Sequence, residues 1–182
     1  NEPAFKRTRR GATVTLAEEQ HEAKSLELLE RLNAYQTCSS VKNIREQRQA
    51  LPVMQRAGDI LVKVELNQVT LCMAATGSGK TTQIPQILLD DYILRKQGSK
   101  CNIICTQPRR IAAMSVAQRV AEERGESVGD TIGYQVRFDH KLPRPNGSIT
   151  FCTTGVFLRR LQTAMNDNSG APTFLDDLTH IM

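Results

Sequence analysis

The chain has 182 residues, an apolar fraction of 40% and a formal net charge of +5. Its apolar runs are far shorter than the roughly 18 residues that a membrane-spanning helix needs, so we expect no membrane partner. The basic balance favours a polyanionic partner, and the absence of tryptophan argues against an aromatic platform as the main contact with nucleic acid.

The five cysteines are odd in number and show no C-x-x-C spacing. Disulfide frameworks and zinc sites use paired cysteines, so we expect free thiols and an intracellular protein of the nucleus or cytoplasm. Cys101 and Cys105 could form half of a metal site, but no His or Cys partner is near them in the sequence, which favours small core residues. Because the sequence opens on Asn1 and not on Met, we treat it as a fragment in which native targeting signals can be missing.

Residues 1–50 form a predicted N-terminal extension. The cluster Lys6-Arg7-Thr8-Arg9-Arg10 is either a solvated basic tail or an arm for nucleic acid. From Glu18 to Tyr35, the apolar residues recur at three-residue steps and predict an amphipathic helix, which packs on this protein's own body or on a partner. The residues of this stripe are Ala23, Leu26, Leu29 and Leu32.

A domain boundary is predicted near residue 51. Ser40 is the expected N-cap of a short helix that ends near Ala50, and Leu51-Pro52 then interrupts the helical pattern. A further helix is expected over 53–65, with Ile60, Leu61 and Val64 on one side. Residues 51–182 are therefore expected to form the globular α/β domain.

The next stretch predicts a phosphate-binding loop. The apolar run 69–73 is the expected strand, Ala74 to Thr81 has the spacing of a P-loop, and a helix-like segment follows. Gly77 and Gly79 allow backbone N–H groups to turn toward phosphate oxygens. The alternative is a Gly/Ser turn followed by an accidental lysine.

The residue types of this loop assign roles for a nucleoside triphosphate. Lys80 would reach the β- and γ-phosphates, and the Thr81 hydroxyl would bind the Mg²⁺ ion that bridges them. The expected ligands are ATP and Mg²⁺, with Lys80 and Thr81 as the catalytic pair. The predicted nucleotide-binding loop residues are Ala75, Thr76, Gly77, Ser78, Gly79, Lys80, Thr81 and Thr82.

Strands and helices then alternate along the chain. A helix is expected over 81–96, bent near Pro85, with Ile84, Ile87, Leu88 and Tyr92 facing inward. A buried strand over 100–106 and a helix over 111–124 follow. Such alternation predicts a parallel sheet with helices on both faces, whose ligands bind beyond the carboxyl ends of the strands.

The last third of the chain continues the pattern. Strands are expected over 134–138, 148–153 and 178–182, with a turn over 143–147 and a helix over 156–164. Residues 165–172 read as a polar loop. Asp176-Asp177 precedes the final apolar run and is expected in a solvated loop or helix end.

Four blocks stand in a fixed order: 75–85, Thr-Gln-Pro-Arg-Arg-Ile-Ala-Ala (106–113), Gly-Tyr-Gln-Val-Arg-Phe (133–138) and Thr-Thr-Gly (153–155). Together they resemble the first RecA-like domain of the DEAH-box/RHA group of superfamily 2 RNA helicases. The likeness spans about residues 48 to 182. The expected fold is thus an α/β P-loop NTPase sheet of the RecA-like type, preceded by an α-helical extension and incomplete at its C-terminus.

The resemblance implies ATP hydrolysis coupled to translocation on single-stranded RNA and unwinding. It places motif I on Ala74 to Thr82 and implies that Arg119 stacks on the adenine. It also implies protein activators that act on parts of the parent protein outside this sequence. The implied RNA-binding residues are Thr106, Gln107, Pro108, Arg109, Arg110, Thr153, Thr154 and Gly155.

Arginines and hydroxyls at strand ends suit phosphate and sugar contacts that hold a strand without reading its sequence. A surface salt bridge at a helix start is the alternative for Arg109 and Arg110. Two other functions compete with the helicase: a P-loop kinase, and a noncatalytic nucleotide- or RNA-binding scaffold.

The sequence departs from the family at two places. Ala74-Ala75 stands where the family has Gly-Glu, and the family's Asp-Glu-x-His motif would follow directly on a segment like 178–182. Without those acidic groups and the second domain, phosphoryl transfer lacks essential parts. We therefore expect this fragment to bind nucleotide weakly at best and not to hydrolyse it.

Overall fold

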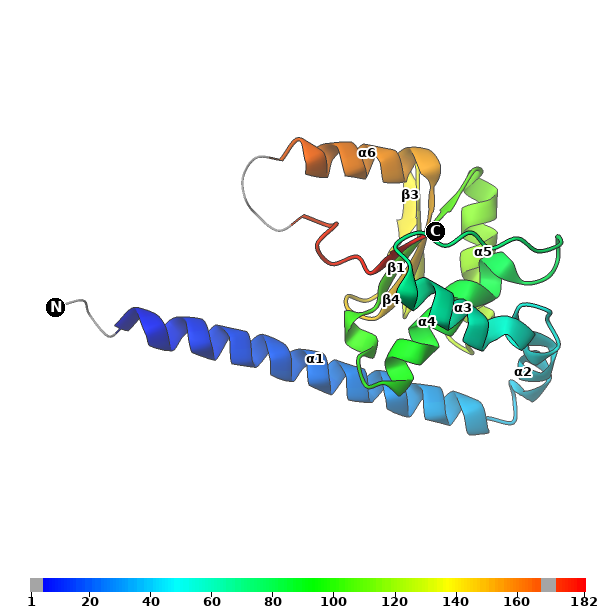
Figure 1. Cartoon of the computed structure of the whole chain (residues 1–182), viewed down its shortest axis with the longest axis horizontal. Helices are drawn as coiled ribbons and strands as arrows, with labels where there is room; N and C mark the ends of the chain where they lie inside the picture. The colour runs from blue at the N-terminus through cyan, green and yellow to red at the C-terminus, as the bar shows by residue number, and fades with distance from the viewer. Residues whose placement is uncertain (1–4, 168–172) are drawn as a thin grey trace.

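The computed structural model describes residues 5–167 and 173–182, with side chains from Glu18 onward (Figure 1). None of the helices in these two ranges is long and apolar enough to cross a membrane. The elements in chain order are α1 (Phe5–Thr37), α2 (Lys42–Gln49), η1 (Met54–Arg56), α3 (Ala57–Leu66), α4 (Lys80–Leu94), η2 (Gly98–Lys100), β1 (Asn102–Gln107), α5 (Arg110–Glu123), β2 (Ile132–Val136), β3 (Asp139–Lys141), β4 (Ser148–Thr153), α6 (Thr154–Met165) and β5 (His180–Ile181).

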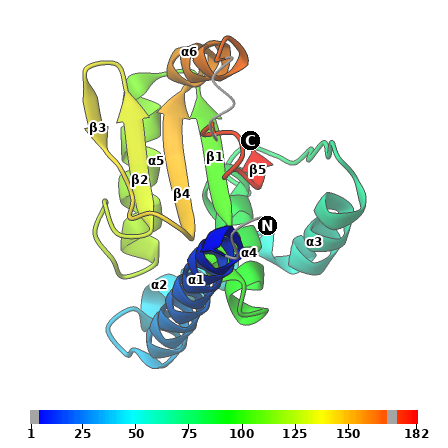
Figure 2. The ribbon, with the colours of Figure 1, turned by 90° about the vertical axis from the view of Figure 1, so that its left-hand side faces the viewer.

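The five strands form one sheet in the order β3-β2-β4-β1-β5 (Figure 2). β1 pairs in parallel with β4 and β5, β4 pairs in parallel with β2, and β3 runs antiparallel beside β2. The predicted α/β fold with a largely parallel sheet is confirmed. Because four strands share a direction, their carboxyl ends meet at one edge of the sheet.

One face of the sheet is covered by α4 and α5. Side chains alternate between the two faces of a strand, so Ile103 and Cys105 of β1 and Ile149 and Phe151 of β4 share this face. All four are buried in the main hydrophobic cluster with residues of α4 and α5. Through this cluster the sheet supports α4 and α5, the helices that follow residues 75–79 and 106–109.

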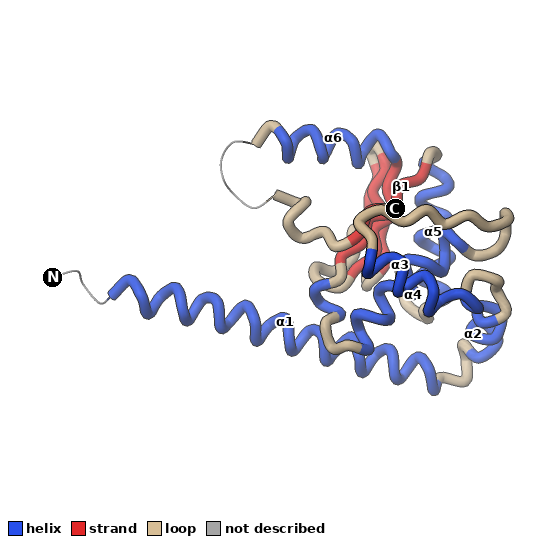
Figure 3. Tube along the Cα trace, viewed as in Figure 1, coloured by secondary structure: helices blue, strands red, loops and turns tan. Residues whose placement is uncertain are grey.

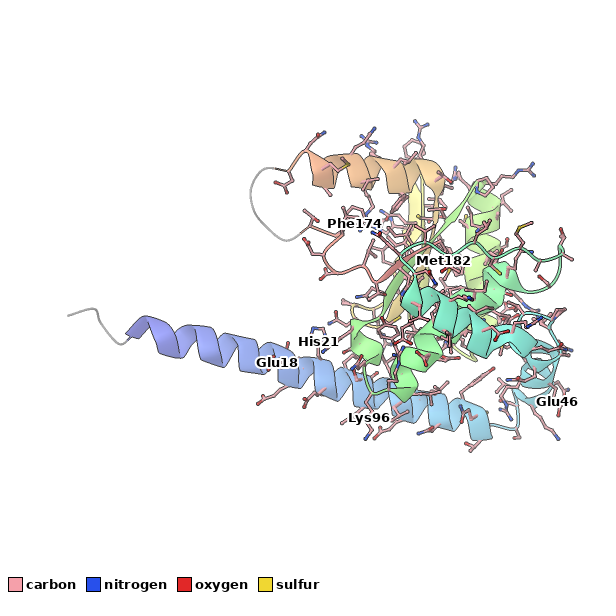
Figure 4. The ribbon with its side chains drawn as sticks, in the orientation of Figure 1. Glu18, His21, Glu46, Lys96, Phe174 and Met182 are labelled. Carbon is pink, nitrogen blue, oxygen red and sulfur yellow. The ribbon has the colours of Figure 1, made fainter. Side chains whose placement is uncertain are left out.

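The opposite face is covered by α6 and the segment after it. Ile104 of β1 and Cys152 of β4 pack against Phe157 of α6. Phe174, which lies below α6 in Figure 4, meets Phe157 edge to face, with the ring centroids 6.4 Å apart. Helices therefore flank both faces of the sheet, as predicted.

Helix α1 begins at Phe5 and runs through the predicted basic tail, so the expected start at Glu18 is wrong. Lys, Arg and Ala, which make up six of residues 5–17, favour helix. Figure 1 shows the first half of α1 standing clear of the body. The side chains of the basic cluster 6–10 lie outside the described residues.

The buried face of α1 differs from the predicted stripe. Leu28 and Leu32 join the main cluster, whereas Ala23 and Leu26 are exposed. A helix has 3.6 residues per turn, so three-residue steps drift around its axis and leave the face. The helix packs on the body of its own chain, which was the first of the two alternatives.

The two short helices before the loop also correct the prediction in part. Val41, not Ser40, is the N-cap of α2, and no side chain caps this helix. Ser40 Oγ lies instead 3.0 Å from Cys38 Sγ. The predicted helix over 53–65 is divided into η1 and α3, and Ile60, Leu61 and Val64 are partly buried as expected.

The predicted strand over 69–73 is wrong. Residues 67–75 form no strand and run as an extended loop between α3 and α4 (Figure 3). Val69, Leu71 and Met73 are 86%, 84% and 85% exposed. A strand needs a hydrogen-bonded neighbour, and none of the strand pairings in the sheet includes residues 67–75.

The prediction that Cys101 and Cys105 are core residues is confirmed. All five thiols are free, and Cys101, Cys105 and Cys152 are buried. Burial raises the pKa of Cys101 to about 12 and that of Cys152 to about 11. These three residues therefore act as small apolar side chains of the core.

Candidate nucleotide and RNA site

The loop between the extended segment and α4 has the backbone of an anion cradle. Gly77 and Gly79 have φ values of +81° and +93°, a region that costs an L-residue about 1–2 kcal/mol. Gly79 is the N-cap of α4, and no side chain caps the first turn. The first N–H groups of α4 are therefore open to an anion, and the helix dipole adds to the attraction.

Lys80, the first residue of α4, holds its ammonium group inside the loop. Nζ donates to the carbonyl oxygens of Ala74 and Ala75, the second at 2.8 Å, and lies 3.5 Å from Ser78 Oγ. Phosphate oxygens are charged and accept stronger hydrogen bonds than carbonyl oxygens. The side chain is thus placed to exchange its carbonyl partners for a phosphate group.

The cradle opens into a cleft of about 800 Å³. Lys80 and Thr81 line it from α4, Thr106 and Gln107 from the end of β1, and Met182 from the end of the chain. Thr106 is tied to Met182 because its backbone N–H donates to the Met182 carbonyl oxygen at 2.7 Å. The cradle therefore faces the carboxyl ends of β1 and β5.

The two predicted RNA-binding blocks are neighbours in space. Gln107 is in register with Thr153 on the adjacent strand, and Thr154 Oγ1 lies 3.5 Å from the Gln107 carbonyl oxygen. Helices α5 and α6 start next to these strand ends. The members of the two blocks that are exposed are Pro108, Arg109, Arg110, Thr154 and Gly155.

The cleft unites only part of the predicted site. Thr106 and Gln107 share it with the cradle, whereas Arg109, Arg110 and residues 153–155 do not line it. They continue the same carboxyl edge of the sheet beyond the cleft. The carboxyl edge of the sheet thus offers a cleft beside Lys80 and, next to this cleft, an open track formed by the exposed residues 108–110 and 154–155.

Comparison with known proteins identifies the family. No protein-family profile matches the chain. It is 43% identical over 154 residues to the DExH-box ATP-dependent RNA helicase DExH1 of Arabidopsis thaliana, which covers 85% of this chain and 15% of that protein. It is 47% identical over 133 residues to the ATP-dependent DNA/RNA helicase DHX36 of Homo sapiens, covering 72% and 13%. The chain belongs to the DExH/DEAH-box helicase family.

A third DExH/DEAH-box relative, the ATP-dependent RNA helicase DHX30 of Gallus gallus, is 46% identical over 132 residues, covering 72% of this chain and 10% of that protein. The predicted resemblance to the DEAH-box group is confirmed. The chain spans 10% to 15% of the length of these three relatives. It therefore corresponds to one part of a DEAH-box protein.

Arg119, the residue that the DEAH-box resemblance assigns to the adenine, lies on α5 with its side chain 56% exposed. Its Nε donates to Glu123 Oε1 at 2.8 Å. The other oxygen of that carboxylate accepts a hydrogen bond from Gln83 of α4 at 2.7 Å. Arg119 and the helix that starts at the cradle are therefore joined through one carboxylate.

The prediction missed a basic and aromatic hairpin at the same edge of the helicase sheet. The expected strand over 134–138 ends at Val136, and Arg137 and Phe138 form the turn to β3, which was not predicted. Phe138 is 87% exposed, and the Arg137 guanidinium lies 4.7 Å from its ring centroid. With Arg159 and Arg160 of α6, they line a cleft of about 590 Å³.

The signal for this hairpin was present in the sequence. Arg137-Phe138 places a cation beside an aromatic ring, the two side-chain types that stack on nucleic acid bases. The alternation was taken to extend through Phe138. The left-handed backbone at Phe138, with φ +68°, ends the strand instead.

Replacement of Gly79 by alanine is expected to destabilise the helicase fold and the cradle together. The positive φ costs about 1–2 kcal/mol in the free energy of unfolding. A Cβ would also lie 3.0 Å from Leu51 Cδ1 and 3.2 Å from Val53 Cγ1, which pushes the loop away from its support. Urea unfolding and ATP titration of the variant measure the two effects.

The matched control is Gly58→Ala on α3. A Cβ at Gly58 meets nothing within 4 Å, so this change is expected to stabilise the protein by about 0.5–1 kcal/mol without altering ATP binding. Equal stability changes at the two glycines would refute the conformational role assigned to Gly79.

Proposed function

We propose that this chain is the nucleotide-binding part of an ATP-dependent RNA helicase motor. The observation that carries the proposal is the shared edge: Lys80 of the cradle and Thr106 and Gln107 at the end of β1 line one cleft, and residues 108–110 continue the same carboxyl edge of the sheet beyond it. The names of the relatives support it, since all three are ATP-dependent helicases. Both ligands are polyanions, in accord with the net charge of +5.

The cradle residues fit a nucleoside triphosphate. Gly77 is exposed at positive φ with open space around it, so that phosphate oxygens can approach the backbone closely. Lys80 would hold the β- and γ-phosphates, and the exposed Thr81 hydroxyl would supply the protein ligand of Mg²⁺. Phosphate oxygens of the nucleotide would supply further ligands of the ion.

RNA would lie along the open part of the edge. Arg109 and Arg110, together with the hydroxyl of Thr154, present donors near the starts of α5 and α6, where phosphate and sugar oxygens are bound without reading bases. The exposed Phe138 and Arg137 lie at the end of β2 on the same sheet edge. The track would therefore hold single strands of any sequence.

We also propose that this chain binds nucleotide without hydrolysing it. Among the described residues that line the cleft, Asp59 of α3 is the one acidic side chain. Phosphoryl transfer requires groups that hold the metal and position the attacking water. A noncatalytic scaffold would share this property, so RNA-stimulated ATP hydrolysis by a protein that joins this chain to an Asp-Glu-x-His segment and a second domain would separate the two functions.

A turnover assay on the chain tests this step. We expect no RNA-stimulated release of phosphate from ATP, while ATP binding in the presence of Mg²⁺ remains measurable by NMR titration. Substantial RNA-stimulated hydrolysis would show that the chain carries a complete catalytic set.

Neutralising Arg109 and Arg110 should weaken RNA binding in a salt-dependent way. For Arg109→Gln/Arg110→Gln, the slope of log K against log salt concentration should fall by about 1–2, because up to two phosphate contacts are lost. Fluorescence titration of labelled single-stranded RNA at several salt concentrations measures the slope.

The control is Arg144→Gln, before the amino end of β4, where the guanidinium is 2.8 Å from Asp130. We expect this variant to keep the original slope. An equal reduction by Arg144→Gln would show that general charge, and not the strand edge, binds RNA.

A further inference from the structure

A buried carboxylate lies between the two helices that carry the nucleotide site. Glu123 of α5 is 3% exposed, and its Oε2 accepts hydrogen bonds from Gln83 Nε2 at 2.7 Å and Gln86 Nε2 at 2.9 Å, both from α4. Its Oε1 accepts the bond from Arg119. A buried charge is costly unless it is paired, so the folded protein needs positive groups close to Glu123.

Two arginines neutralise Glu123: Arg119 on its own helix, at 2.8 Å, and Arg48 of the predicted N-terminal extension. The Arg48 side chain on α2 is 8% exposed, and its Nε lies 3.9 Å from Glu123 Oε2. Nε donates to Gln83 Oε1 at 2.9 Å, and one terminal nitrogen donates to Tyr35 Oη of α1 at 2.9 Å. Tyr35 in turn donates to the Glu123 carbonyl oxygen at 2.6 Å. Arg48 therefore joins α1, α2, α4 and α5.

The link reaches the cradle through Gln83. Its amide oxygen is fixed by Arg48, so its nitrogen must face Glu123 and the neighbouring Thr82, whose Oγ1 it approaches at 2.9 Å. Thr82 Oγ1 lies 3.3 Å from the Gly79 carbonyl oxygen. A chain of contacts thus runs from Arg48 to the last glycine of the loop.

The segment just after Arg48 touches the cradle directly. The Val53 N–H donates to the Ser78 carbonyl oxygen at 3.2 Å. Leu51 and Val53 supply the side chains that lie against Gly79. Residues 48–53 therefore support the loop by backbone, apolar and charged contacts.

From these contacts we infer that Arg48 is a positioning residue of the nucleotide site: through Gln83 and Thr82 it fixes the cradle, and through Glu123 it orients Arg119. The inference rests on the function proposed above and extends it to residues 35–53. Nucleotide affinity then depends on how the N-terminal helices are packed. Arg48 itself touches no phosphate.

The test compares Arg48→Met with Arg45→Met in the chain of 182 residues. Arg45 also lies on α2, donates to the carbonyl oxygens of Tyr35 and Cys38 and lies 5.8 Å from the Tyr35 ring centroid, but has no bond to Gln83 or Glu123. NMR titration with inorganic tripolyphosphate and with ATP gives the two dissociation constants. The amide resonances of Gly77 and Gly79 are recorded without ligand.

We expect Arg48→Met to weaken the binding of both ligands by about tenfold. It should also shift the amide resonances of Gly77 and Gly79, because the loop itself moves. Arg45→Met should leave the affinities and resonances unchanged at a similar loss of melting temperature. Arg48→Lys keeps the charge but replaces the planar guanidinium, which bonds Gln83 and Tyr35 through two different nitrogens, by one ammonium nitrogen. This variant should fold and should show the same shifts with a smaller loss of affinity.

A folded Arg48→Met or Arg48→Lys protein with unchanged glycine resonances and affinities would overturn the inference. A loss confined to ATP, with tripolyphosphate unaffected, would also overturn the route through the cradle. Failure of the unsubstituted chain to bind either ligand would instead count against the proposed function, because the glycine resonances report on the loop independently of binding.

Discussion

Lys80→Ala is expected to weaken binding of ATP in the presence of Mg²⁺ by about tenfold to a hundredfold. A hydrogen bond to a charged group contributes about 1.5–3 kcal/mol, and the ammonium of Lys80 is the cation that the cradle holds among its own carbonyl groups. The fold should be little affected, because Ala74 and Ala75 are exposed and water can replace the lost donor. NMR titration of the variant measures the change.

Lys100→Ala is the matched control for Lys80. Lys100 is exposed in η2, before the amino end of β1 and so at the edge of the sheet opposite to the cleft. Its removal lowers the net charge by the same amount and should leave ATP binding unchanged. If both variants weaken binding equally, total charge rather than the cradle governs the affinity.

Phe151→Ala is expected to lower the free energy of unfolding by about 3–5 kcal/mol. Phe151 is 0% exposed in the central strand β4, in register with Cys105 on one side and Tyr134 on the other. Alanine there leaves a cavity beneath α4 and α5. Since small domains have only about 5–15 kcal/mol in total, the variant should lose a large share of its stability in a urea titration.

Phe138→Ala provides the comparison for Phe151. The same atoms are removed, but this side chain is 87% exposed in the turn to β3, so the stability should change by less than about 0.5 kcal/mol. Similar losses at the two positions would show that β4 is not at the centre of the core.

Local patterns predicted most of the fold. The runs that became β1 and β4 are short, apolar and bounded by turn residues, which is typical of buried strands in a parallel sheet. The segment 69–73 has the same composition but no paired neighbour in the structure. A strand forms only beside a pairing partner that is remote in sequence, and the composition of a segment does not show whether such a partner is present.

The same distinction explains which parts of the site were predicted. The cradle is contiguous, so its glycines, Lys80 and Thr81 could be recognised by spacing alone. The link from Arg48 to Glu123 joins residues far apart in sequence, and each alone has the composition of an ordinary helix surface. Only the packing of α1 and α2 against α4 and α5 brings them together.

The most direct test of the nucleotide site is to map the amide shifts of the isotope-labelled chain during titration with ATP and Mg²⁺. The cradle and its exposed helix start predict that the largest shifts fall on residues 76–82, with a further shift at the Arg119 side chain, and that Lys80→Ala removes them. Shifts confined to another part of the surface, or no shifts at millimolar ATP, would contradict the assignment of the loop as a triphosphate site.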